Sequence, residues 1–413
     1  MELTNELVVM APIQVKGSLS PGNIYDLTLI DFYAKTRQMQ GFKVSVPIFW
    51  NVNGLPVLNM MQKQGLPLSR ETRNEFVNKC IRDGLEILKK HYINFDEQIK
   101  DDEISPMISK FIETYSKSII LRGPISIAIC EKCGSDFGTD AEIILCKICG
   151  GSVSMQVRDV LFQKVSRDDV SNKIGRINIY PTGAKKELIT FNESMPEEYN
   201  ICLTKRREYT ISYAGFDLDP RFIVMLTPAL VDGMYSRRVY FHGDIIKKFS
   251  YYSLCHLPDR FLPTDIVCHG VLLDKYGRKI RWQDIDEDLL NQFNNLPKND
   301  LRAFLLKRNV SKDVLIDFET IHGNLREQDI LRNRMDGILG YSDCLESSLP
   351  FLVLRKEFFE AVDRYFYGVA YDKMLKIVDL LENKTGESIH NEERKFLDQL
   401  RYLYFGEYHG IKN

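Results

Sequence analysis

Four cysteines stand in two closely spaced pairs near the middle of the chain. Cys130 and Cys133 form one Cys-x-x-Cys pair, and Cys146 and Cys149 form a second pair, separated from the first by 12 residues and followed by two glycines. Pairs of thiolates on tight turns match the tetrahedral coordination that Zn²⁺ prefers. Because four thiolates leave no open coordination position, the pattern predicts a structural rather than a catalytic zinc ion.

A second candidate site is the turn between an apolar run, Leu7–Met10, and an amphipathic segment that starts at Ile24. A helix that follows such a glycine- and proline-containing turn presents free backbone N–H groups and the positive end of its dipole, which suits a phosphate. Far downstream, His269–Trp282 is an apolar strand that leads into a glycine-turned basic loop. Most strand-to-helix turns bind no ligand, so these two segments are by themselves only a candidate nucleotide site.

The elements around the first turn follow a strand, helix, strand order. Apolar residues at helical spacing predict a helix over Ile24–Gly41, and a strand is expected over Phe42–Phe49. This order is typical of a parallel sheet, whose ligands lie beyond the carboxyl ends of the strands. We also expect a helix from Ser69 to about His91 and a strand over Phe222–Leu226.

Composition limits the classes of protein that the chain can belong to. With 413 residues it is too long for one small core, and its net charge of -2 and pI of about 6.4 do not indicate a general nucleic-acid binder. No uncharged run approaches 18 residues, so no membrane span is expected. The five scattered cysteines favour a reducing compartment, and we expect a cytoplasmic protein.

The two nucleotide-site segments resemble the signatures of class I aminoacyl-tRNA synthetases. Gly17–Asn23 is similar to Gly-x-x-His-Ile-Gly-His, and Gly277–Gln283 is similar to Gly-x-Lys-Met-Ser-Lys-Ser. Gln40–Val57 resembles the Trp-Asp-x-x-Gly-Leu-Pro region of the leucine, isoleucine, valine and methionine group. Tyr240–Ile246 resembles the Gly-x-Asp-Ile-Ile element near the ribose. The resemblance covers most of Leu7–Phe318.

This resemblance implies an α/β fold: a Rossmann-like parallel sheet of class I synthetase type, split by a zinc-binding insertion and followed by a C-terminal α-helical bundle. We expect the first half of the Rossmann domain in 1–95, the connective insertion with its zinc knuckle in 96–195 and the second half in 196–298. A truncated anticodon-binding-like bundle is expected in 299–413, where Arg355–Leu381 shows an amphipathic pattern.

The resemblance also implies site residues. On the amino-acid side these are Pro12, Asn51 and Asn53; under the phosphates, Ser20, Gly22 and Asn23; at the ribose, Gly243 and Asp244; and in the closing loop, Lys279 and Arg281. Beyond these, His242, His256 and His269 show no metal spacing and are interpreted as packing or capping residues.

Several of these positions depart from the family pattern. Ser20 and Asn23 stand where the family has histidines, Trp282 stands where it has the second lysine of the loop, and Asn51 replaces the aspartate that helps hold the ammonium of the amino acid. Groups aimed at transition-state charge commonly contribute about 3 kcal/mol each, so losing two slows adenylate formation roughly 10⁴-fold. Ordinary tRNA charging is therefore not expected.

Three hypotheses remain open. In the first, the chain has an altered amino-acid activation or aminoacyl-transfer activity with ATP, an aminoacyl-adenylate or an aminoacyl-tRNA as substrate. The second is a non-catalytic pseudo-synthetase that binds a nucleotide, an amino acid or a partner. The third is a diverged true synthetase that uses Arg281 and Asn23. Contact with the acceptor end of tRNA stays open, whereas anticodon recognition is not expected, because the bundle is short and the charge nearly neutral.

Overall fold

The computed structural model describes most of the chain. The described residues are 5–53, 55–100, 103, 105–116, 119–132, 145–146, 150–204, 211–226, 230–231, 234–243, 249–280, 287–318, 321–340, 342–344, 347–384 and 388–406.

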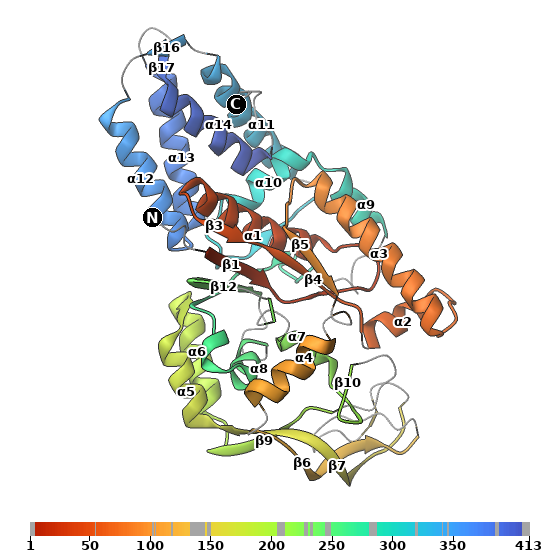
Figure 1. Cartoon of the computed structure of the whole chain (residues 1–413). Helices are drawn as coiled ribbons and strands as arrows, with labels where there is room; N and C mark the ends of the chain where they lie inside the picture. Colours follow the sequence, from red (N-terminus) through yellow and green to blue (C-terminus); the bar gives the residue numbers. More distant parts are fainter. Residues whose placement is uncertain are drawn as a thin grey trace.

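Five strands form a central, wholly parallel sheet (Figure 1). Their order across the sheet is β3 (Lys43–Ser45), β1 (Asn5–Met10), β12 (Arg237–His242), β13 (Asp265–Cys268) and β8 (Asn178–Tyr180). Strand β1 therefore lies beside β12, more than 200 residues away in sequence, with Val8 opposite Val239. The predicted α/β fold with a parallel sheet is confirmed.

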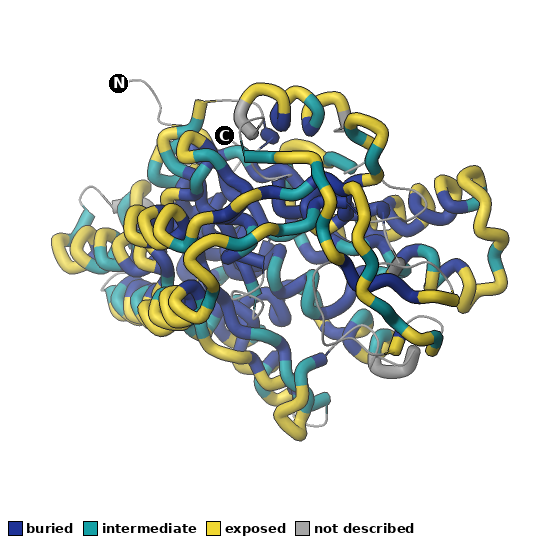
Figure 2. Tube along the Cα trace, turned by 90° about the horizontal axis from the view of Figure 1, so that it is seen from below, coloured by how far each residue is buried: buried dark blue, intermediate teal, exposed yellow. Residues whose placement is uncertain are grey.

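Helices cover both faces of this sheet, because alternate side chains of β1 point to opposite sides. Val8 and Met10 belong to one core with helix α1 (Pro21–Met39), whereas Leu7 and Val9 belong to a second core. The second core is covered by α5 (Arg167–Arg176), α6 (Thr182–Glu193) and α8 (Phe249–His256). Figure 2 shows the buried segments gathered in the middle of the molecule.

A smaller parallel sheet adjoins the first turn. It contains β2 (Ile13–Gln14), β4 (Pro47–Asn51) and β5 (Glu97–Lys100), and helices α2 (Leu55–Lys63) and α3 (Arg70–Lys90) lie beside it. The single strand predicted over 42–49 is therefore wrong. It divides at Val46, whose N–H donates to the Asp96 carboxylate at 2.6 Å, and Pro47 after it has no N–H to continue a ladder.

The segment Phe222–Leu226 was expected to be a strand, and this prediction is wrong. It lies in the buried helix α7 (Pro220–Leu226). Asp219 starts the helix, because its side chain accepts a hydrogen bond from the backbone N–H of Arg221 at 2.9 Å. A short apolar run carries no periodicity that distinguishes a buried helix from a buried strand.

An antiparallel arm extends from the sheet domain at the bottom of Figure 1. It consists of β6 (Ile120–Cys130), β7 (Val153–Ser166) and β9 (Glu198–Cys202), preceded by α4 (Ser105–Phe111) and a π-helical turn, Ile112–Ser116. A short hairpin, β10 (Ser212–Tyr213) and β11 (Phe216–Asp217), follows.

The C-terminal part is helical, as predicted. Its helices are α9 (Glu287–Asn295), α10 (Lys298–Leu306), α11 (Ile321–Leu339), α12 (Leu349–Asp363), α13 (Tyr367–Glu382) and α14 (Asn391–Phe405). Short parallel pairs join β14 (Leu272–Leu273) to β15 (Val314–Leu315) and β16 (Ser342–Cys344) to β17 (Ser388–His390). Within the parts of the chain that the structure describes, no helix is long and apolar enough to cross a membrane.

A buried ion-pair cluster fixes the helical part to the sheet domain. Arg302 of α10, only 1% exposed in its side chain, contacts the Asp31 carboxylate of α1 at 2.6 Å and donates to the carbonyl of Leu403 in α14 at 2.7 Å. Lys35 lies 2.9 Å from the same carboxylate. One arginine therefore joins three helices at the junction between the two parts.

Candidate functional site

The first turn leaves the carboxyl end of β1 and leads to the start of α1. After Pro12, strand β2 pairs with β4, so that Gln14 lies opposite Asn51, and the N–H of Val15 donates to the Asn51 carbonyl at 3.0 Å. Gly17 has a φ of 123°, a conformation that favours glycine. This pairing brings the predicted amino-acid side, Pro12 and Asn51, next to the predicted phosphate side.

Ser20 and Asn23 form a capping box at the start of α1. The Ser20 hydroxyl lies 2.9 Å from Asn23 Oδ1 and accepts from the Asn23 N–H at 3.2 Å, while Asn23 Oδ1 accepts from the Ser20 N–H at 3.3 Å. Both residues lie where the sequence predicts them, but their oxygens are engaged with each other. Gly22 lies between them and has open space beside it, since an added Cβ would meet only Ser20 Oγ, at 3.6 Å.

Asn51 and Asn53 lie in a buried amide network. The Asn51 amide donates to Gln14 Oε1 at 3.0 Å, and its own oxygen accepts from the Asn53 N–H at 3.2 Å. Arg73 of α3, 5% exposed, donates to Asn53 Oδ1 at 3.0 Å. The side-chain oxygens of both asparagines therefore already accept hydrogen bonds within the protein, and a cation lies beside them. Gln14 and Arg73 were not predicted from the sequence.

The ends of β12 and β13 face the start of α1. His269, 6% exposed, follows β13, and its ring lies 3.3 Å from the position that a Cβ on Gly243 would take. The same ring packs edge-on against Tyr25 and lies 3.6 Å from the Asp26 carboxylate. Interpreting His269 only as a packing residue therefore misses that it lies at the edge of the sheet. The signal in the sequence that could have identified His269 is a polar residue directly after a buried parallel strand.

The closing loop rests on the segment that precedes α11. Gly270 passes so close to Lys312 that a Cβ would come within 2.3 Å of the Lys312 backbone, which makes glycine necessary there. Asp274 accepts from the N–H groups of Tyr276 and Arg278, both at 2.9 Å, and closes a tight turn. Lys279 then pairs back with Leu273.

Asp244 and Arg281 lie outside the described residues, and so do Cys133 and Cys149 of the cysteine quartet. Of that quartet, Cys130 and Cys146 are described and buried, at 1% and 3% exposure. Cys130 lies opposite Val153 in the ladder between β6 and β7, and the Cys146 N–H donates to the Gly151 carbonyl at 2.8 Å. Both thiols therefore flank the start of β7.

Three other histidines are buried and should weaken the fold in acid. Burial lowers the pKa of His91, His242 and His256 to about 3. The unfolded chain binds these protons below about pH 6.5 while the folded protein does not, so stability falls as pH falls, by about 1.4 kcal/mol per pH unit for each histidine. Urea titrations from pH 7 to 5 measure this slope. His256→Gln should reduce the proton uptake on unfolding by about one, and an unchanged slope would contradict the assignment.

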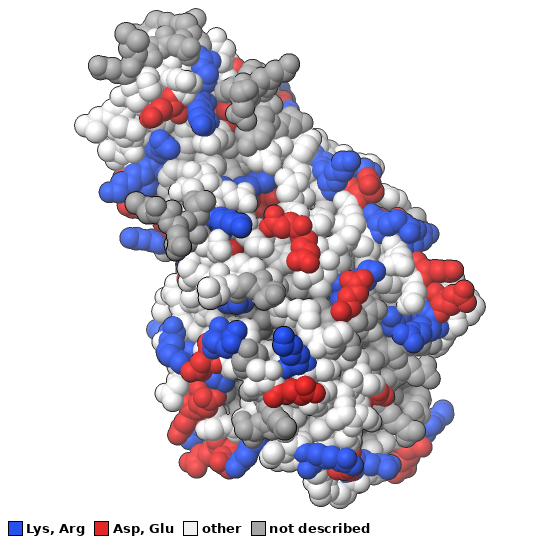
Figure 3. Space-filling view, viewed as in Figure 1, with Lys and Arg blue, Asp and Glu red and all other residues white. Residues whose placement is uncertain are grey.

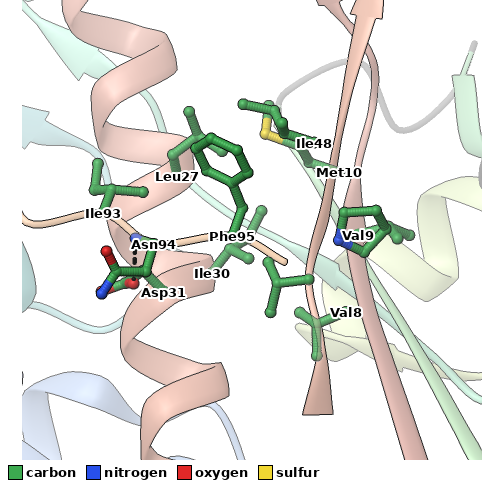
Figure 4. A pocket seen from close by; sticks show the side chains of 12 residues that line it. Val8, Val9, Met10, Leu27, Ile30, Asp31, Ile48, Ile93, Asn94 and Phe95 are labelled. Carbon is green, nitrogen blue, oxygen red and sulfur yellow. Dashed lines mark hydrogen bonds between the residues drawn. The ribbon is translucent and has the colours of Figure 1, made fainter. Parts of the chain in front are cut away.

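A narrow pocket opens between β1, α1 and residues 93–95 (Figure 4). Its walls are mostly aliphatic side chains, and the Asn94 N–H donates to the Asp31 carboxylate there at 3.0 Å. Asp31 is the ionisable residue among those that line the pocket, and it is already paired with Arg302.

Figure 3 shows cationic and anionic side chains interspersed over the face seen in Figure 1.

The relatives of known function match only part of the chain in sequence. No protein-family model matches it. Valine–tRNA ligase of Pyrococcus abyssi is 25% identical over 134 residues, which is 30% of this chain and 15% of that protein. Valine–tRNA ligase of Rickettsia prowazekii is 31% identical over 100 residues, 24% of this chain and 12% of that protein. The match thus spans under a sixth of the length of these curated relatives.

Solved structures match almost the whole chain in fold. Mycobacterium tuberculosis methionyl-tRNA synthetase in complex with methionyl-adenylate has a TM-score of 0.72 at 14% identity, covering 98% of this chain and 92% of that one. An Agrobacterium radiobacter K84 LeuRS in a ternary complex with tRNA and LeuAMS has a TM-score of 0.75 at 11% identity, covering 98% and 84%. The chain is therefore similar to class I aminoacyl-tRNA synthetases in fold over almost its whole length, and in sequence to valine–tRNA ligases over about a third of its length or less.

Proposed function

We propose that this chain is a synthetase-like protein whose pocket serves an altered amino-acid activation or an aminoacyl transfer, with ATP, an aminoacyl-adenylate or an aminoacyl-tRNA as substrate. The observation that carries this proposal is the sheet edge itself. Gly243 follows β12, His269 follows β13, and Pro12 follows β1 in the turn that leads to α1. All three strands end at the same edge of the parallel sheet, where a nucleotide site is expected.

The side chains at this edge support an altered rather than an ordinary reaction. Where the resemblance leads us to expect histidines, the neutral side chains of Ser20 and Asn23 hydrogen-bond each other and supply no positive charge to a triphosphate. Where it leads us to expect an aspartate, Asn51 is neutral and hydrogen-bonded to Gln14. A reaction that starts from an already activated aminoacyl group has less need of such charges.

A pseudo-synthetase is the second candidate. It is favoured because Ser20, Asn23 and Asn51 already make hydrogen bonds within the protein. In that case the edge binds a nucleotide, an amino acid or a partner without chemistry. A diverged true ligase for a leucine-, isoleucine-, valine- or methionine-like amino acid is the third candidate; it would depend on Arg281 and Asn23. For each candidate we propose a cytoplasmic protein, contact with at most the acceptor end of tRNA, and ribose contacts from Gly243 and Asp244.

We also propose a structural Zn²⁺ held by Cys130, Cys133, Cys146 and Cys149. The two described thiols support this proposal, since both are buried and both flank the start of β7. A turn closes beside them, where the Gly150 N–H donates to the Cys146 carbonyl at 2.9 Å and Gly150 has a φ of 68°. Such a glycine-turned pair fits thiolate ligation of zinc.

Ligand-dependent thermal stability tests the proposed pocket. A ligand that binds only the folded protein stabilises it by about 2.7 kcal/mol at a concentration of 100 Kd. We expect a rise in melting temperature with one aminoacyl-sulfamoyl-adenosine analogue, among a panel with ATP and the twenty amino acids. No rise with any of them would overturn the pocket.

Activity assays then separate the three candidates. Pyrophosphate exchange with ATP would support a true ligase or an ATP-dependent altered enzyme. Consumption of aminoacyl-tRNA without ATP would support a transferase, and stabilisation without either reaction would support the pseudo-synthetase.

A further inference from the structure

Lys16 occupies the middle of the turn that joins the two halves of the candidate site. Before it, the backbone of Val15 is fixed to Asn51 of β4. After it, Gly17 turns the chain toward Ser20, the residue that caps α1. Lys16 lies four positions before this cap, so its backbone belongs to the segment that leads to the phosphate side of the edge.

The Lys16 ammonium makes fewer contacts than the ammonium groups of two buried lysines, Lys35 and Lys173. Lys35 pairs with Asp31 and donates to a carbonyl at 3.0 Å, and Lys173 pairs with Asp169 and donates to a carbonyl at 3.2 Å. Lys16 is half-buried, and burial lowers its pKa, yet in the described chain no hydrogen bond or ion pair engages its ammonium. A partly desolvated cation without a counter-charge is costly, and an anionic ligand would remove that cost.

The neighbouring side chains leave this role open. The Ser20 hydroxyl donates to Asn23 Oδ1 within the capping box, and neither Ser20 nor Asn23 carries a positive charge for a phosphate. Arg73, the other cation near the turn, is held at the amino-acid side by Asn53. Among the described residues 11–23 of the first turn, Lys16 is thus the one that carries a positive charge.

We propose that Lys16 supplies the phosphate-binding cation of this site, in place of the signature histidines whose positions Ser20 and Asn23 occupy, and that its ammonium contacts the phosphate groups of a bound adenine nucleotide. The proposal rests on the proposed function, because it requires a nucleotide at this edge. It makes Lys16 a determinant of affinity for the phosphates and leaves the nucleoside to other residues.

Isothermal titration calorimetry with adenosine, AMP and ATP in Mg²⁺ tests whether Lys16 contributes to binding of the phosphates and not of the nucleoside. In Lys16→Ala we expect ATP affinity to fall about tenfold or more, the loss of a charge-assisted hydrogen bond, while adenosine affinity stays within about twofold. Lys16→Arg should keep ATP affinity within about threefold, because the charge remains. Lys43→Ala is the matched control, since exposed Lys43 begins β3 at the opposite, amino-terminal edge of the same sheet.

Two results would overturn the proposal while leaving the nucleotide pocket intact. One is a Lys16→Ala protein that binds ATP as the unchanged protein does, with adenosine still bound. The other is an equal loss for adenosine and ATP, which would make Lys16 structural. If the unchanged protein binds none of the three compounds, the proposed pocket and the role of Lys16 fall together.

Discussion

Replacing Arg302 with methionine should lower the free energy of unfolding by about 3 kcal/mol. The substitution leaves the Asp31 carboxylate, 2% exposed, without its 2.6 Å partner, and removal of one member of a buried pair commonly costs about 3–5 kcal/mol. The lower end applies because Lys35 stays 2.9 Å from the same carboxylate. Urea denaturation of the two proteins at pH 7 measures the difference.

Two further variants separate the buried charge from general damage. Adding Asp31→Asn to Arg302→Met should cost less than the sum of the two single changes, because the uncompensated charge disappears with the carboxylate. Arg176→Met should cost under about 1 kcal/mol, although Arg176 contacts Asp259 at 2.7 Å, because both side chains are more than half exposed. A cost for Arg302→Met as small as that for Arg176→Met would show that the cluster does not join the helices.

Local signals account for the elements that the sequence predicted well. Helix α1 was expected over Ile24–Gly41 and extends from Pro21 to Met39, because Ser20 caps its start and Gly41, with a φ of 91°, follows its end. Helix α3, expected from Ser69 to His91, has those two residues as its caps. Periodicity and capping residues lie within one turn of each other, so a sequence displays them directly.

The features that the sequence did not predict depend on partners far along the chain. Strand β4 leaves the central sheet because β2 and β5 pair with it there, and neither pairing is visible in the residues 42–49. The hydrogen bond from the Asn51 side-chain amide to Gln14 Oε1 joins positions 37 residues apart. Residue types therefore indicated which side chains belong to the site, while the contacts that occupy those side chains required the fold.

The capping box shows how this difference changes a functional argument. From the sequence, Asn23 was a substitute for a histidine at a phosphate site. In the structure its oxygen stabilises the start of α1, as does the Ser20 hydroxyl, so the pair explains a stable helix without any ligand. The case for a nucleotide therefore depends on the backbone of this edge, on Gly243 and on Lys16.

Removing the proposed zinc should unfold the turns at the tip of the arm. Binding of structural Zn²⁺ contributes about 10–16 kcal/mol in small zinc modules, far more than the hydrogen bonds that close the turn at Cys146. We expect one zinc per chain by elemental analysis of the purified protein. A strong chelator should lower the melting temperature and speed hydrogen exchange at the amides of Glu131, Cys146 and Gly150, each bonded within the arm.

Cysteine variants locate the metal. Cys146→Ser should reduce zinc content well below one per chain, whereas Cys202→Ser, a cysteine of β9 outside the quartet, should retain it. A metal-free protein with unchanged stability and exchange would remove the zinc site. The argument for a site at the sheet edge would remain, because the pairing of β2 with β4 and of β12 with β13 does not involve the arm.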